Sequence, residues 1–176
     1  VVSGGALGID TAAHSAVVAG GGRTIVVLGC GMDIEYPRDN LKMFDRIASE
    51  NLGAVISEYP LAAQPEGWRF PQRNRIISGL SIGVTVVEAG LQSGALKTAF
   101  IALEQGREVM AVPGNVDKET SRGTNGLIKD GAALVETAQD IMRSIGMFML
   151  EPVPVQATLQ LELPAHGLPE GQRRLL

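Results

Sequence analysis

The stretch Thr24-Ile-Val-Val-Leu28, followed at once by Gly29, determines the fold class of this chain. A continuous apolar run is typical of a strand that helices cover on both faces, as in a parallel sheet. Segments with helical periodicity separate it from further runs of this kind. These runs lie at the start of the chain and at residues 54–57, 82–87, 108–112 and 132–135. Strand, turn and helix in repetition predict an α/β fold with a doubly wound, mostly parallel, Rossmann-like sheet over residues 1–146.

Glycines and cap residues mark the ends of the helices between these strands. The first helix is expected to run to about Ala19, where Gly20-Gly21-Gly22 stops it. Asp39 or Asn40 is expected to cap a second helix, which reaches about Asn51 and ends at Gly53. Further helices are predicted at residues 73–81, 95–105, near 127–129, and at 138–145.

The two ends of the chain lead to separate expectations. From Met147 onward the periodicity fades and prolines interrupt the sequence, so residues 147–176 are expected to form a linker or tail. The chain begins at Val1 inside a predicted strand and without an initiator methionine. We therefore expect a fragment whose sheet lacks its first strand.

The composition limits the classes of protein to which the chain can belong. Its 176 residues are 45% hydrophobic and 19% charged, which is the range of a globular domain. A net charge of -4 argues against a generally basic nucleic-acid coat, although a local cationic groove stays open. The single cysteine, Cys30, excludes an internal disulfide framework and suits a cytoplasmic protein. No apolar run reaches the roughly 20 residues that a membrane-spanning helix requires, so no membrane partner is expected.

Residues suited to binding anions follow nearly every predicted strand. Parallel strands end at the same edge of a sheet, where ligands bind, so we expect these residues to converge. Backbone amides, hydroxyl groups, helix N-termini and guanidinium groups together favour anionic oxygens. The candidate phosphate-binding residues are Ser3, Gly4, Gly5, Gly8, Ser93, Gly94, Gly114 and Ser121, joined by Arg38 and Arg122. Tight packing is the alternative for the first glycines, because their spacing is not that of a dinucleotide fingerprint.

The segment Trp68–Ser81 concentrates cations and aromatic rings in an otherwise acidic chain. It contains Arg69, Arg73, Arg75, Trp68 and Phe70. Pro71 disfavours helical geometry at the residue before it, so we expect a loop followed by a helix from Arg73. Such a segment can offer cations to a phosphate chain, while Trp68, Phe70 or Tyr59 stacks on a base. The alternative is an ordinary loop with solvated arginines and with its aromatic rings packed underneath.

Groups that could support catalysis are few. Asp10 and His14 stand four residues apart on one helix face and could pair, but a cap and a packing histidine explain them better. Cys30 has no positioned base. Glu88, at the end of a strand, could act as a general base in a nucleotide-cleaving enzyme or could cap the next loop. Ligands with the usual spacing of a metal site are missing. We therefore expect no catalytic residue, no metal and no cofactor, and a binding protein in place of an enzyme.

Four motifs resemble segments of the bacterial DNA-processing protein A family, also called DprA or Smf. They occur in family order and spacing between residue 1 and about residue 142, and together they are specific. The motifs are Ser3–His14 (SGxAxGIDxxAH in the family), Phe70–Ser81 (FPxRNRIIxGLS), Val87–Ala89 with Ser93–Ala95 (VVEA…SGSL), and Val112–Gly114 with Ser121–Asn125 (VPG…SRGTN).

The resemblance implies a Rossmann-like, cytoplasmic protein that binds single-stranded DNA and forms dimers. It further implies a role in natural transformation and competence, in which the protein helps to load the recombinase RecA onto DNA, with no known catalysis. By the same resemblance, Arg73, Asn74 and Arg75 would lie in or beside the DNA pocket, and Arg38 would be a further phosphate contact. Arg122, in the SRGTN match, is the last candidate contact.

The chain departs from the family pattern in several places. By comparison with the family pattern, we expect a fragment without the preceding strand, whose Gly-Ser-Arg turn supplies an arginine to the same pocket, and without the helical and winged-helix domains. Gly5, Leu7 and Lys97 replace residue types that are common in the family. The alternative function is that of a Rossmann-like nucleotide phosphoribohydrolase with Glu88 near the sugar. Such an enzyme should carry a Pro-Gly-Gly-x-Gly-Thr loop where this chain has residues 91–96.

Overall fold

The computed structural model describes residues 1–147, which form six strands, six α-helices and two 3₁₀ turns. The 3₁₀ turns are η1 (Arg38–Asn40) and η2 (Glu119–Ser121). In chain order, the other elements are β1 (Val2–Ser3), α1 (Ile9–Ala19), β2 (Thr24–Val27), α2 (Leu41–Ser49), β3 (Gly53–Ile56), α3 (Arg69–Gly79), β4 (Gly83–Val86), α4 (Gly94–Glu104), β5 (Glu108–Ala111), α5 (Arg122–Lys129), β6 (Ala133–Leu134) and α6 (Ala138–Ser144).

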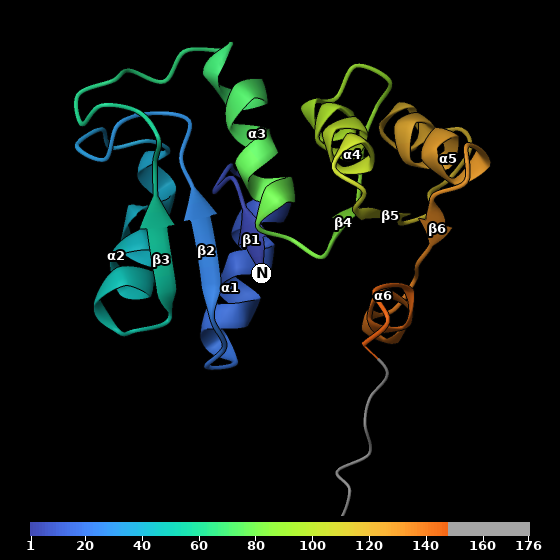
Figure 1. Cartoon of the computed structure of the whole chain (residues 1–176), viewed down its shortest axis with the longest axis horizontal. Coiled ribbons are helices and arrows are strands. Elements are labelled where there is room, and N and C mark those ends of the chain that lie inside the picture. The colour runs from blue at the N-terminus through green and yellow to red at the C-terminus, as the bar shows by residue number, and fades with distance from the viewer. Residues whose placement is uncertain (148–176) are drawn as a thin grey trace, which may run out of the picture.

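All paired strands are parallel, which confirms the predicted fold class. They form two three-stranded sheets, with the orders β1-β2-β3 and β4-β5-β6, and not one continuous sheet. Val26 lies opposite Val55 in the first sheet, and Thr85 lies opposite Met110 in the second. Figure 1 shows the first sheet with α1 and α2 in one half of the molecule, the second sheet with α4, α5 and α6 in the other, and α3 between them.

Each half has its own hydrophobic core around its central strand. Val26 in β2 is fully buried and belongs to a cluster with Phe44 and Ile47 of α2. Ala111 in β5 is fully buried and belongs to a cluster with Ala99 of α4 and other apolar residues. The burial of these central strands agrees with the continuous apolar runs, because helices or loops cover both faces.

The start of α3 differs from the prediction. The helix begins at Arg69 and not at Arg73, so Pro71 is its third residue. Proline is tolerated in the first turn because the N–H groups there have no intrahelical acceptor. Packing of the Phe70 ring against Gly29 accompanies the earlier start, since a Cβ atom on Gly29 would lie only 2.6 Å from that ring.

Other boundaries also shift. Helix α2 ends at Ser49, and Gly53 opens β3 with a φ of 142°, so Gly53 does not end the helix. Its Cβ would lie 1.7 Å from the carbonyl oxygen of Thr24, so the close approach of β2 requires glycine here. Helix α5 begins at Arg122, earlier than the predicted start near Leu127. The predicted linker or tail lies outside the described residues, except for Met147.

Candidate functional site

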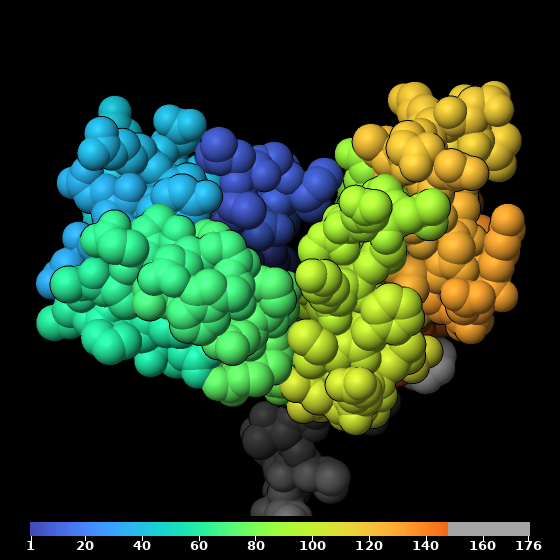
Figure 2. Space-filling view, turned by 90° about the horizontal axis from the view of Figure 1, so that it is seen from above, coloured from blue at the N-terminus to red at the C-terminus, as the bar shows by residue number. Residues whose placement is uncertain are grey.

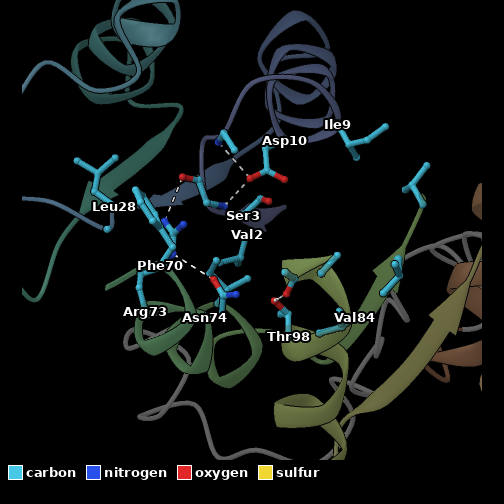
Figure 3. Close-up of a pocket in the computed structure, with 18 of the residues that line it drawn as sticks. Val2, Ser3, Ile9, Asp10, Leu28, Phe70, Arg73, Asn74, Val84 and Thr98 are labelled. Carbon is cyan, nitrogen blue, oxygen red and sulfur yellow. Dashed lines mark hydrogen bonds between the residues drawn. The ribbon is translucent and has the colours of Figure 1, made fainter. Parts of the chain in front are cut away.

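A cavity of about 650 Å³ lies between the two half-sheets. The inner edge of the first sheet, the inner edge of the second sheet, α3 and the start of α4 all contribute to its wall. Figure 2 shows the molecule hollowed between the N-terminal segment and the second half, and Figure 3 shows residues of the wall. Among its lining residues are Val2, Ser3, Gly4, Asp10, Leu28, Tyr36, Phe70, Arg73, Asn74, Val84, Val86, Glu88, Gly94 and Thr98. We call this space the central cavity.

Arg73 is the cation of the central cavity. Its residue is only 5% exposed, and its Nη1 donates a hydrogen bond of 3.1 Å to the carbonyl oxygen of Gly4. A Cβ on Gly4 would lie 2.6 Å from Nη2, so a larger residue at this position would displace the Arg73 guanidinium. Burial lowers the pKa of the Arg73 guanidinium and the nearby Asp10 carboxylate opposes that shift, but an arginine stays charged in proteins. A buried, permanent positive charge therefore joins α3 to the loop after β1.

The glycine loop after β1 already holds an anionic group of the protein. The backbone N–H groups of Gly4 and Ala6 each donate a hydrogen bond of 3.1 Å to the Oδ2 atom of Asp10. Gly5 has a φ of 67° and no room for a Cβ against Phe44. These two features are those of a tightly packed turn, the alternative given for this loop in the sequence analysis. Both amides therefore bind the protein's own carboxylate, and phosphate binding by this loop stays a prediction.

Aromatic side chains form another part of the cavity wall. The rings of Tyr36 and Phe70 have centroids 5.9 Å apart at an interplanar angle of 40°. The Arg73 guanidinium lies 5.9 Å from the centroid of the Phe70 ring. A cation beside two rings suits a ligand that carries both negative charge and a flat apolar surface.

Three of the predicted arginines lie outside the central cavity. Arg75, two residues after Arg73, projects from another side of α3, because each helical residue turns the side chain by about 100°. The Arg75 side chain is 58% exposed and pairs with Glu58. Arg38 is 83% exposed with its Nε 3.9 Å from Glu35, and Arg122 pairs with Glu119 at 3.1 Å. Arg73 and Asn74 thus line the central cavity, whereas Arg75 lies outside it. That all three lie in or beside a DNA pocket stays a prediction.

The predicted loop residues of the second half divide in the same way. Gly94 lines the central cavity, and Ser93 caps α4 by accepting a hydrogen bond of 3.3 Å from the Ala95 amide. Ser121 is buried against Gly114, where a Cβ would lie 2.2 Å from the Ser121 Oγ. Asn125 fixes that turn by hydrogen bonds of 3.1 and 2.9 Å to the Gly114 amide and carbonyl.

Of the eight candidate phosphate-binding residues, Ser3, Gly4 and Gly94 line the central cavity. Gly5, Gly8, Ser93, Gly114 and Ser121 do not. That any candidate residue contacts DNA stays a prediction.

Three of the side chains considered for catalysis are His14, Cys30 and Glu88. His14 is fully buried, with its Nδ1 2.7 Å from the Thr24 hydroxyl, and burial lowers its pKa. Burial likewise raises the pKa of the Cys30 thiol. Glu88 lines the central cavity. Residues 1–147 contain no group of three or more histidines, cysteines, aspartates or glutamates placed to hold a metal ion.

Two structural features went unrecognised in the sequence. Asp39 or Asn40 was expected to cap α2. Asn40 does occupy the N-cap position, but its side chain makes no capping bond and donates hydrogen bonds to the Gly5 carbonyl (2.9 Å) and the Thr11 hydroxyl (2.8 Å). Asparagine is common at caps and in buried clamps, so residue type gave no signal for the difference. The second feature is the division of the sheet between β1 and β4. Within residues 1–147, β1 pairs only with β2 and β4 only with β5, so the edges that these two strands turn toward the central cavity carry no further strand.

The comparisons with known proteins agree on one family. The family model for DNA recombination-mediator protein A matches residues 1–146. The chain is 48% identical over 142 residues to the DNA processing protein DprA of Streptococcus pneumoniae, a match that covers 81% of this chain and 50% of that protein. It is 46% identical over 156 residues to the protein Smf of Escherichia coli, covering 88% and 41% of the two chains. The chain thus spans about half the length of the curated relatives it matches.

Solved structures give the same result. An X-ray structure of S. pneumoniae DprA superposes with a TM-score of 0.73 at 46% identity, covering 81% of this chain and 50% of that one. A structure of Helicobacter pylori DNA processing protein A, concerned with how that protein binds single-stranded DNA, has a TM-score of 0.72 at 32% identity and covers 82% and 64%. No helix within residues 1–147 has the length and apolar character to cross a membrane. The matching sequence motifs, the two parallel half-sheets and these comparisons show that the chain belongs to the DNA recombination-mediator protein A family.

Proposed function

We propose that this chain binds single-stranded DNA in the cytoplasm and, as a dimer, helps to load RecA onto that DNA during natural transformation. Family membership supports the proposal, as does the related H. pylori protein, whose structure concerns single-stranded DNA binding. The observation in this molecule that carries it is Arg73, a buried cation that lines the central cavity beside Phe70 and Tyr36. A partly desolvated guanidinium attracts phosphate strongly, and the rings offer a surface for a base.

The binding test compares single-stranded with duplex DNA. Fluorescence anisotropy of labelled oligo(dT) and of a labelled duplex of equal length is measured at two salt concentrations. We expect tighter binding of oligo(dT), with an affinity that falls as salt rises because phosphate contacts release counterions. Equal affinity for the duplex, or no binding of oligo(dT), would refute the proposal.

The assembly and loading parts of the proposal need their own measurements. Sedimentation equilibrium should give a mass of two chains. The rate at which RecA filaments form on oligo(dT) should rise when this protein is added. A monomer at all concentrations, or an unchanged filament rate, would contradict the corresponding part and leave DNA binding standing.

The proposal includes one further parallel strand between β1 and β4, which would complete the domain of residues 1–146. Both edges line the central cavity through apolar residues such as Val2, Val84 and Val86. A strand buried on both faces would be apolar throughout. A longer version of the protein, which includes the proposed strand before Val1, should then unfold at a higher urea concentration than the present chain. It should also bind oligo(dT) more tightly. Unchanged stability of the extended version would argue against this strand.

A further inference from the structure

Trp68 stands at the start of α3 as a large aromatic side chain on the surface. It is 52% exposed, and its Nε1–H donates a hydrogen bond of 2.5 Å to the Glu66 carboxylate. The Arg69 guanidinium lies 5.0 Å from the centroid of the Trp68 ring and 5.2 Å from that of Tyr59. We call Tyr59, Trp68 and Arg69 the outer stack.

The outer stack is held in place by several contacts. The Tyr59 hydroxyl donates a hydrogen bond of 3.1 Å to the carbonyl oxygen of Arg69. The Arg69 side chain is mostly buried, lies 3.2 Å from Glu66, and donates to the Gln64 carbonyl. A ring fixed in this way loses little conformational entropy when a second flat group stacks on its exposed face.

A polar cleft adjoins the outer stack. Glu58, Tyr59, Gln72 and Arg75 line it, and Tyr59 belongs to both the cleft and the stack. Arg75 is the exposed cation of this cleft, paired with the Glu58 carboxylate. An aromatic surface, an amide and a cation therefore lie side by side, on residues that do not line the central cavity.

We propose that the outer stack and its cleft form a second nucleotide subsite for single-stranded DNA, outside the central cavity. A base stacks on the exposed face of Trp68, and the adjoining phosphate takes the place of Glu58 on Arg75. Every base has a π-face, so this subsite tolerates any sequence. The proposal rests on the proposed function, because it extends the path of the same strand over α3.

Trp68 is the only tryptophan of the chain, so intrinsic emission reports directly on this subsite. Unlabelled oligo(dT) is titrated into the protein while tryptophan emission is recorded, and anisotropy of labelled oligo(dT) is measured in parallel. We expect emission to fall along the same saturation curve as the anisotropy. An abasic oligonucleotide of equal length should bind through its phosphates without that quenching.

Substitutions separate the subsite from general binding. Trp68→Leu should weaken oligo(dT) binding about 5- to 150-fold, whereas Trp68→Phe, which keeps a ring, should stay within about twofold of the unchanged protein. Phe100→Leu on α4, another exposed aromatic, is the matched control and should bind normally.

Glu58→Gln should tighten binding of oligo(dT) about two- to fivefold, because the phosphate no longer competes with a carboxylate for Arg75. Circular dichroism confirms that each variant is folded.

The outcomes distinguish the two proposals. If anisotropy saturates while emission stays constant and Trp68→Leu binds like the unchanged protein, the second subsite is refuted and single-stranded DNA binding stands. Equal quenching by the abasic oligonucleotide also refutes base stacking on Trp68. If oligo(dT) produces no anisotropy change at all, the proposed function itself fails, and the subsite fails with it.

Discussion

Arg73 and Arg75 are two positions apart in one motif but lie on different surfaces of the molecule. Arg73 is buried and donates to Gly4, whereas Arg75 is exposed and pairs with Glu58 in the outer cleft. The difference follows from helical geometry, which turns side chains two residues apart to different faces. Arg73 therefore contributes to the fold as well as to the proposed binding site, and Arg75 contributes charge alone.

Arg73→Lys tests the structural part of that statement. Lysine keeps the charge but lacks the planar fork, so the contacts to Gly4 and Asn74 are not reproduced. We expect the free energy of unfolding to fall by about 1.5–3 kcal/mol, the range for hydrogen bonds of charged groups. Urea unfolding measures it, with Arg46→Lys on the exposed face of α2 as the control. Equal stability of the two variants would show that the Gly4 contact does not stabilise the fold.

Arg75→Ala tests the contribution of an exposed cation to DNA binding. Loss of one phosphate contact should weaken oligo(dT) binding and reduce the magnitude of the salt slope by about one charge, ~0.7 in logarithmic slope. The matched control is Arg46→Ala, which removes another exposed arginine that pairs with a glutamate. Affinity and slope that match those of the control would exclude Arg75 from the binding surface.

At the level of elements, α3 connects the two halves and carries most of the proposed binding residues. One side contributes Phe70, Arg73 and Asn74 to the central cavity, and another contributes Gln72 and Arg75 to the outer cleft. The helix also packs extensively on α4. A displacement of α3 would therefore change both surfaces together.

The loop after β1 depends on η1 through Asn40, the residue that precedes α2. Because the Asn40 side chain is buried and satisfies the Gly5 carbonyl and Thr11, Asn40→Ala should destabilise the fold by about 1–3 kcal/mol. Asn115→Ala, in an exposed turn, serves as the control and should change stability by less than about 0.5 kcal/mol. Thermal unfolding checks both variants. A similar loss for both would mean that the buried clamp has no special role.

At the scale of the whole molecule, the two half-sheets have separate cores and share the central cavity. β1 is the inner edge of the first half, and its packing includes the buried hydroxyl of Thr24, which donates to the Val1 carbonyl at 3.0 Å. His14 adjoins the same hydroxyl at 2.7 Å. The protonation state of His14 is therefore tied to the stability of this half.

Stability should fall in mildly acidic solution because of His14. Burial lowers its pKa in the folded state below the ordinary value of 6.5, so the unfolded chain binds more protons between these two values. The contribution is complete above pH 6.5 and is lost as the pH falls below it, by at most about 1.4 kcal/mol per pH unit. Urea midpoints at pH 7.5 and 5.5 measure the loss. His14→Leu should show a smaller difference between the two pH values, and an unchanged difference would exclude His14 as the cause.

The sequence alone determined the α/β class, the parallel direction of the strands and the family, because apolar runs such as 24–28 and the spaced motifs are local properties of the chain. It also located Gly4, Arg73 and Asn74 near one site, since parallel strands end at a common edge. Only the tertiary structure decided that the sheet divides between β1 and β4. It also decided that the loop amides donate to Asp10, and that the Arg75 side chain lies in the outer cleft and not in the central cavity. These features depend on contacts between segments far apart in the chain and on the rotation of single side chains, neither of which a local pattern encodes.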